Sequence, residues 1–377
     1  MLPLGHRGWK DFDIYMLVTT FVLMGFGVVA IWSATGEDIL TISNLGVRQA
    51  MFGVLGVVVM FTLANIDYRF LASFAWMFYA GTLLALVAVL AIGTVVGGSQ
   101  RWIDLGSVFS FQPSEFGKLA TMITLAAFIS SRGTAMSEFG NFFVSILIVA
   151  VPMGLIFIEP DLGSTTVYAI IWLSMMMVAR TRKLFLAMIV AVAVPAFFFV
   201  WEVLFLDPRF SYMKERLLIS YHPETDPTDE GFNIIQARIS IGSGGLFGHG
   251  LQGGTQSQLE LLRVRTTDFI FAHASGMFGY LGMLALFASF LILVWRCLRT
   301  AESARDSFGQ CFAIGVAGIL FYQAFVNIGM NVGLMPVTGI TLPFVSYGVS
   351  SLWTFLAAEG ILQSILMRQR KLAFQPD

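Results

Sequence analysis

Apolar residues gather in ten long runs along the chain, separated by short polar connections and by one long one. A transmembrane helix needs about 20 mainly apolar residues, and the runs are of about that length. The pattern therefore predicts an all-α integral membrane protein, a bundle of ten transmembrane helices that form a single polytopic domain over residues 1–377. The predicted spans are Ile14–Trp32, Val47–Ala64, Phe70–Ile92, Ser114–Ile129, Phe142–Phe157, Leu162–Val178, Leu184–Leu206, Phe269–Val294, Phe308–Met330 and Pro343–Leu366.

The basic residues predict how this bundle is oriented. One set of connections, which includes both chain ends, holds 13 of the 22 Lys and Arg residues, whereas the opposite short connections hold only Arg48 and Arg101. Cytoplasmic loops carry the excess of positive charge, so we expect both termini in the cytoplasm. The long connection, residues 207–268, then lies outside the cell. The first run lacks a small-residue cleavage site, and we expect it to be a helix rather than a signal peptide.

Composition narrows the class of protein. Hydrophobic residues make up 57% of the chain and charged residues only 12%, against about 25% charged residues in an average soluble domain. A soluble enzyme, a disordered chain and a nucleic-acid-binding protein are therefore excluded. The two cysteines, Cys297 and Cys311, cannot make a disulfide framework, and we expect them to be free structural thiols.

Polar clusters at the outer ends of the predicted spans are candidate functional residues, because polar groups at membrane depth are expensive and usually functional. Arg101 and Trp102 lie in the outer connection after the third run. Arg101 could bind a phosphate or a carboxylate, and Trp102 could equally be an interfacial anchor. Glu115 and Lys118 are three residues apart and share a helix face. They could line a cavity or form an ion pair that only satisfies itself.

Two aspartates stand where the chain re-enters the membrane from outside. Asp161 lies in the hairpin between the fifth and sixth runs and could simply cap the sixth helix. Asp268 ends the long outer loop. It could cap the eighth helix, or it could point into an outward cavity as a general base or a metal ligand.

A segment rich in Gly and Pro, Asn331–Gly348, connects the last two runs. Broken backbone at membrane depth is tolerated only where it is buried in protein or lines a cavity, so we expect this segment, with Ser346, to face a substrate. Arg48, at the outer start of the second run, is a further candidate cavity residue. Glu359 lies inside the last run, and we expect it to face the bundle interior. The four histidines have no metal-ligand spacing.

Together these clusters predict an outward-facing polar cavity lined by Arg, Glu, Lys and Asp side chains. Mixed charge with basic groups suits a ligand that carries a pyrophosphate. Spacing alone does not name that ligand.

At these residues the chain resembles the SEDS family (shape, elongation, division and sporulation), and the resemblance covers nearly the whole chain. The order and spacing of the signatures match, and the loop text HPETDP (His222–Pro227) is closer to the rod-shape RodA branch than to the division FtsW branch. The matching segments are RWIDLG (Arg101–Gly106), FQPSEFGK (Phe111–Lys118), EPDLGST (Glu159–Thr165), IGSGGLFGHGLQGGTQSQLELL (Ile241–Leu262), TDFIFA (Thr267–Ala272) and NIGMNVGLMPVTGITLPFVSYG (Asn327–Gly348).

The resemblance implies a peptidoglycan glycosyltransferase with a GT-C-like fold in the bacterial cytoplasmic (inner) membrane. Its substrate would be lipid II, an undecaprenyl-pyrophosphate disaccharide-pentapeptide, polymerised at the outer face of the membrane during cell-wall elongation. Its partner would be a class B penicillin-binding protein. The family's essential aspartate matches Asp268, as general base or metal ligand of an inverting transfer, and a divalent cation, Mg²⁺ or Mn²⁺, could assist. The family's cavity residues match Glu115, Lys118, Arg101, Trp102 and Asp161.

The chain departs from the family pattern around the loop aspartate. Arg263, Val264 and Thr266 stand where the family has a Pro, a Glu and a His, and Gly276 and Met277 replace a pair of glutamates. Two other functions fit the same spans: a lipid II flippase, and a non-catalytic scaffold for the penicillin-binding protein. A flippase is expected to offer polar groups on the inner side as well, whereas the clusters in this chain are concentrated on the outer side.

Overall fold

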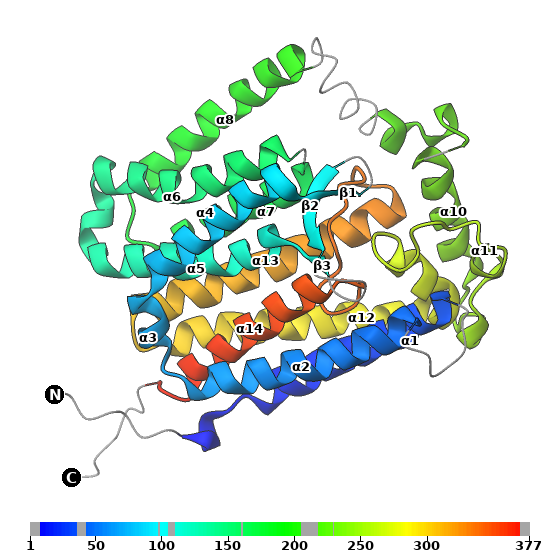
Figure 1. Ribbon diagram of the computed structural model, residues 1–377, viewed down its shortest axis with the longest axis horizontal. Coiled ribbons are helices and arrows are strands. Elements are labelled where there is room, and N and C mark those ends of the chain that lie inside the picture. The colour runs from blue at the N-terminus through cyan, green and yellow to red at the C-terminus, as the bar shows by residue number, and fades with distance from the viewer. Residues whose placement is uncertain are drawn as a thin grey trace.

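The computed structural model describes residues 8–35, 43–96, 99–104, 110–159, 161–204, 218–228 and 230–369. Each of the ten apolar runs contains one long helix (Figure 1). Within the described residues, eight of these helices have the length and hydropathy to cross a membrane, and α7 is apolar but shorter. The all-α membrane class is confirmed, and the count of ten spans stays a prediction. The helices are α1 (Ile14–Thr35), α2 (Leu45–Asn65), α4 (Ala75–Ile92), α5 (Pro113–Arg132), α6 (Phe139–Ile158), α7 (Leu162–Val178), α8 (Lys183–Leu204), α12 (Ile270–Ser303), α13 (Ser307–Val332) and α14 (Val349–Leu366).

Two runs begin differently from the prediction. The third run is shared by α4 and a short helix, α3 (Tyr68–Ser73), because the backbone leaves the helical conformation at Phe74. The last helix starts at Val349 rather than at Pro343. Phe344 has a φ of 64°, which a right-handed helix does not accommodate, so the residues before α14 form turns instead.

A small antiparallel sheet lies in the connection between α4 and α5, and the apolar pattern did not predict it. Its strands, β1 (Thr94–Val96), β2 (Ser99–Asp104) and β3 (Ser110–Phe111), are hydrogen-bonded in that order. Thr94 pairs with Trp102, and Ile103 pairs with Phe111. The sheet holds β2 against α4 and the start of α5.

Helix α14 is the centre of the bundle. It packs against α2, α5, α12 and α13, and every residue from Val349 to Leu366 except Trp353 is buried. In Figure 1, α14 lies among these helices, whereas α8 lies at the periphery. Because α14 is enclosed by protein, it carries polar side chains that a lipid-facing helix could not.

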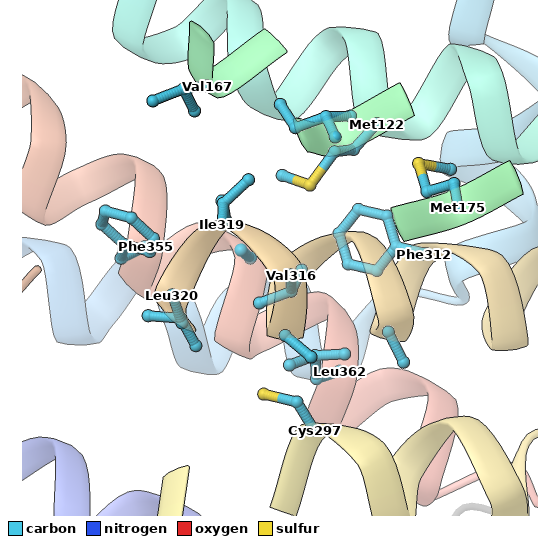
Figure 2. Close-up of a cluster of buried hydrophobic side chains, with 14 of the residues drawn as sticks. Met122, Val167, Met175, Cys297, Phe312, Val316, Ile319, Leu320, Phe355 and Leu362 are labelled. Atoms are coloured by element: carbon cyan, nitrogen blue, oxygen red, sulfur yellow. The ribbon is translucent and has the colours of Figure 1, made fainter. Parts of the chain in front are cut away.

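The apolar core fills the space between the central helices (Figure 2). Met122 on α5 and Met175 on α7 face Phe312 on α13, and all three side chains are buried. Transmembrane helices associate largely through such close van der Waals packing. Cys297 and Cys311 lie in this core as free buried thiols, which confirms the expectation for the two cysteines.

The predicted outer loop, residues 207–268, is folded where the structure describes it. It contains two α-helices, α10 (Glu230–Ser243) and α11 (Thr255–Gln258), and two short 3-10 helices, η4 (Pro223–Thr225) and η5 (Gly250–Gln252). Helix α10 packs against α12 and α13. Residues 207–217 and 229 of this loop lie outside the described residues.

The end of the bundle at which α1 begins and α14 ends collects ion pairs. The backbone N–H of Asp13 donates to Oε1 of Gln363 at 2.9 Å, which joins the two helices there. The short 3-10 helices η1 (Trp9–Asp11) and η2 (Gly133–Ser137) belong to connections on this side, the predicted cytoplasmic side. We refer to the opposite end as the outer end; the orientation in the membrane stays a prediction. The ion pairs are Asp13–Arg296 at 2.6 Å, Arg69–Asp306 at 3.6 Å and Asp67–Arg368 at 3.6 Å.

Candidate active site

Arg101 on β2 and Asp161 before α7 form an ion pair at the outer end, with Nη1 and Oδ2 3.3 Å apart. Asp161 also caps α7: its Oδ1 accepts the backbone N–H of Ser164 at 2.9 Å, and its Oδ2 accepts the Ser164 hydroxyl at 2.9 Å. The capping alternative therefore describes this aspartate well, and the ion pair adds a second role. Because Asp161 is only 4% exposed, its carboxylate serves to hold Arg101 in place.

Glu159 precedes this aspartate in the same polar cluster of the sequence, which assigned it no role of its own. It follows the last residue of α6 and is buried, and its Oε1 has no hydrogen-bond partner among the described residues. Burial raises the pKa of the Glu159 carboxyl to about 8, with a further upward contribution from the charge of Asp161, while Arg101 acts in the opposite direction. Glu159 is thus a carboxylic acid that keeps its proton near neutral pH.

Glu115 and Lys118 form a close pair in the first turns of α5, with Nζ and Oε1 2.6 Å apart. Pro113 at the helix start has the backbone angle that a first helical turn needs, and Glu115 benefits from the positive end of the helix dipole. Both side chains are almost completely buried, and the second oxygen of Glu115 has no hydrogen-bond partner among the described residues. The pair therefore satisfies itself in part and leaves one carboxylate oxygen available to a polar group.

Tyr168 on α7 connects the two clusters, which the sequence left separate. Its hydroxyl donates to the backbone carbonyl of Ser114 at 2.9 Å. The same side chain lies within electrostatic range of Glu115, Glu159 and Asp161. The second and third polar clusters of the sequence are therefore one region of the molecule.

Asp268 lies two residues before the start of α12, and two asparagines of α13 hold its backbone carbonyl. Nδ2 of Asn331 donates to this carbonyl at 2.9 Å, and Nδ2 of Asn327 donates to it at 3.2 Å. Oδ1 of Asn331 accepts the backbone N–H of Ala272 at 3.1 Å. Phe269 occupies the N-cap position of α12 and makes no side-chain capping bond. The first turn of α12 is thus fixed by α13, in a position that leaves Asp268 half-buried.

The Gly- and Pro-rich segment before α14 packs on the loop that carries Asp268. The hydroxyl of Ser346 donates to the carbonyl of Thr267 at 2.8 Å and accepts the N–H of Leu342 at 2.9 Å. The N–H of Tyr347 donates to the carbonyl of Thr266 at 2.9 Å. Ser346 therefore holds the two loops together, and its place in a substrate cavity stays a prediction.

Close contacts at two glycines place the Gly- and Pro-rich segment between the loop of Asp268 and the start of α7, which Asp161 caps. Gly339 has a φ of 70°, and a Cβ at this residue would lie 4.0 Å from Oδ2 of Asp268. A Cβ at Gly163, in the first turn of α7, would collide with the carbonyl of Thr338. The segment thus runs between Asp268 and the start of α7, with residues 342–346 buried in protein and Gly339 exposed.

A family model described as cell cycle protein, which groups FtsW, RodA and SpoVE, matches residues 14–371. The chain belongs to this family. It is 37% identical over 363 residues to the peptidoglycan glycosyltransferase MrdB of Escherichia coli K12, covering 96% of this chain and 95% of MrdB. It is 32% identical over 432 residues to the peptidoglycan glycosyltransferase RodA of Treponema pallidum, covering 96% and 99%. These relatives support the RodA-like branch.

The fold agrees with this membership. A chain of a solved peptidoglycan synthase complex, described as coordinating polymerization and crosslinking, superposes with a TM-score of 0.81 at 28% identity. The match covers 95% of this chain and 98% of that chain. The outer-end site therefore belongs to an enzyme of the FtsW, RodA and SpoVE family.

Two contacts lie beside the positions at which this chain departs from the family pattern. Arg265 ties the loop before Asp268 to the bundle: its Nε donates to the carbonyl of Ala34 at 2.7 Å, and its Nη1 donates to that of Ser257 at 3.1 Å. A Cβ at Gly276 would lie 3.0 Å from Oγ of Ser240. The close approach of α10 thus occupies the space that a glutamate would need at this family position.

Two further candidates are Arg48 and Trp102. Arg48, in the first turn of α2, and Trp102, on β2, are each half-buried. Gln49, beside Arg48, donates from Nε2 to the carbonyl of Ser346 at 3.2 Å. Sequence reasoning missed Gln49 and Asn327 and named Asn331 only as the first residue of the Gly- and Pro-rich segment, because a buried amide carries no pattern that reveals its partner.

The described residues do not form a metal site by themselves. No three His, Cys, Asp or Glu side chains within them are placed to hold a metal ion. The divalent cation stays an expectation from the family resemblance.

Proposed function

We propose that the protein is a peptidoglycan glycosyltransferase of cell-wall elongation that polymerises lipid II, with Asp268 as the general base. The observation that carries the proposal is the rigid support of the Asp268 loop. Asn327 and Asn331 hold its carbonyl, and the turn around Ser346 holds the two residues before it. A carboxylate that must meet one hydroxyl in one geometry needs such support.

The reaction joins a sugar hydroxyl of one chain to the anomeric carbon of another. As the 4-hydroxyl attacks, its proton passes to the Asp268 carboxylate, and the bond from the anomeric carbon to the lipid pyrophosphate breaks. A single displacement inverts the anomeric centre. The leaving pyrophosphate carries negative charge, so fixed cations next to it stabilise the transition state.

Arg101 is the cation that we assign to the pyrophosphate. Its guanidinium is half-buried, and Asp161 holds it from one side. A guanidinium makes paired hydrogen bonds to phosphate oxygens. Asp161 is then a positioning residue, and Lys118 acts with Glu115 as a buried charged pair beneath the site.

Glu159 supplies a neutral hydrogen-bond donor in the same region. A protonated carboxyl next to an anionic ligand avoids the repulsion that a carboxylate would cause. The protonated state of Glu159 supports a site for an anion, because two ionised carboxylates, those of Glu159 and Asp161, beside Arg101 would instead favour a cation.

We also propose that the protein is a multi-pass protein of the bacterial inner membrane and works with a class B penicillin-binding protein. The solved relative is part of a peptidoglycan synthase complex that couples polymerization to crosslinking, which supports a transpeptidase as partner.

A reconstitution assay separates this function from the two alternatives. Purified protein in liposomes, with its cognate transpeptidase, receives fluorescent lipid II; polymer is read on gels, and lipid movement is read by quenching. Polymer formation is the expected result. Lipid movement without polymer would indicate a flippase, and an intact complex with neither activity would indicate a scaffold.

A further inference from the structure

A single carboxyl side chain lies inside the central helix, remote from the outer-end site. Glu359 on α14 is 3% exposed and stands seven residues before the end of the helix at Leu366. At 1.5 Å per residue, this places it about 10 Å from the inner end. The proposed transfer chemistry does not use this residue.

The two oxygens of Glu359 have different surroundings. The hydroxyl of Thr20, on α1, donates to Oε2 at 2.6 Å. Oε1 has no hydrogen-bond partner among the described residues. It belongs to a side chain that lines a cavity of about 10 Å³, a space of about one water molecule.

The cavity is otherwise apolar. Its walls include Met16 on α1, Leu293 on α12, Leu320 on α13 and Phe344 before α14. Figure 2 shows the side of this region formed by Leu320, Phe355, Leu362 and Cys297. Among the described residues of the lining, the Cys297 thiol is the only other side chain that carries a hydrogen-bond donor.

The nearby charges do not neutralise a carboxylate at this position. Asp13 is the charged side chain within electrostatic range of Glu359, and its charge has the same sign. Arg296, on the same side of the bundle, is bound to Asp13 at 2.6 Å. From α13, the cavity lining receives only the apolar side chains of Val316 and Leu320 among the described residues. An ionised carboxylate in these surroundings would be strongly unfavourable.

A metal cation does not fit the site either. Hard cations take about six oxygen ligands, whereas this cavity offers the carboxyl group and one thiol. Oε2 already accepts a hydrogen bond from Thr20, so the carboxyl group needs only one further ligand, at Oε1. A proton is the ligand that fits there.

We propose that Glu359 is an internal proton-binding site: a carboxylic acid whose Oε2 accepts the Thr20 hydroxyl and whose Oε1 carries a proton directed into the cavity. The site joins α1, α12 and α14 at one point. Through Phe344, the cavity that holds Glu359 also contacts the turn that supports the Asp268 loop.

Infrared spectroscopy of the full chain in lipid nanodiscs tests this proposal near neutral pH. Wild type is compared with Glu359→Gln, which keeps the size and the acceptor for Thr20. We expect a C=O stretching band of a protonated carboxyl in wild type that is absent from the variant. Because Glu159 can give a second such band, Glu159→Gln serves as the matched control and must leave the Glu359 band in place.

Thr20→Val provides an independent arm that does not alter the carboxyl. Loss of the hydroxyl donor removes the hydrogen bond to Oε2, so the band is expected to move to higher wavenumber without losing intensity. Identical protonated-carboxyl spectra of wild type and Glu359→Gln would overturn the proposal, as would a band that Thr20→Val leaves unchanged.

Discussion

Asn331 is predicted to be a positioning residue for Asp268, and Asn331→Leu is the change that exposes this role. The amide is fully buried and makes four hydrogen bonds, the longest of them from Nδ2 to Oδ1 of Asn327 at 3.5 Å. Nδ2 donates to the carbonyls of Asp268 and Asn327, and Oδ1 accepts the N–H of Ala272. Leucine has a similar volume, so the substitution removes the hydrogen bonds without leaving a large cavity.

The size of the expected losses in stability and rate depends on which groups lose their hydrogen-bond partners in Asn331→Leu. Ala272 is in the first turn of α12, where backbone N–H groups have no partner within the helix, so its N–H becomes an unsatisfied buried donor. Such a group costs about 1–3 kcal/mol. The carbonyl of Asp268 keeps the longer bond to Asn327. A displacement of the carboxylate by about 1 Å is expected to slow the reaction by about 100-fold.

Two assays measure the two effects. Thermal unfolding in detergent reports the loss of stability, and lipid II polymerisation at saturating substrate reports the loss of rate. Asn65→Leu is the matched control, because Asn65 donates to the carbonyl of Phe61 at the inner end, away from the site. Asn331→Leu with the polymerisation rate of wild type would refute the positioning role.

Three further predictions concern the charged residues of the outer end. Asp161→Asn keeps an acceptor for the cap of α7 but weakens the hold on Arg101, so polymerisation is expected to fall about tenfold, equivalent to about 1.4 kcal/mol, with a higher KM for lipid II; an unchanged KM and rate would contradict it. Lys118→Met leaves Glu115 buried without its partner and is expected to lower the free energy of unfolding by about 3–5 kcal/mol. The double variant with Glu115→Gln should regain this stability but not the polymerisation activity. Regained activity in the double variant would show that the pair is only structural. The folded-state pKa of Glu159 is raised from 4.5 to about 8, so the folded state binds the proton more tightly, and stability is expected to fall as pH rises between these values. The melting temperature of Glu159→Gln should lack this dependence on pH. An equal dependence on pH in both proteins would argue against a buried acid.

Much of the fold could be predicted from the sequence because every helix that crosses a bilayer needs about 20 mainly apolar residues. Apolar runs of sufficient length gave the helices, and the confirmed membrane class rests on them. The break at Phe74 escaped prediction because it lies within a continuous apolar run, and the start of α14 was placed too early because the apolar residues of the Gly- and Pro-rich segment were counted as part of the helix. The β-strands beside Arg101 were also missed, because three short pairing segments carry little signal next to the long apolar runs.

The candidate site was predictable in part, for a related reason. Charged residues at the ends of apolar runs stand out, so Asp268, Asp161 and the Glu115–Lys118 pair could be selected before their surroundings were known. The roles of Asn331 and Glu159 could not be selected, because they depend on contacts between distant segments. The Asn331 amide meets a carbonyl 63 residues away, and the proton on Glu159 follows from burial that the sequence does not show.

The most direct test of the central claim is the polymerisation rate of Asp268→Asn in complex with the cognate transpeptidase. Asparagine keeps the shape of the side chain and the backbone carbonyl that Asn327 and Asn331 hold, but it cannot accept the proton of the attacking hydroxyl. Assembly of the complex and the melting temperature are measured on the same samples. The account predicts an intact, folded complex that makes no glycan polymer. Polymer formed at the wild-type rate would contradict it.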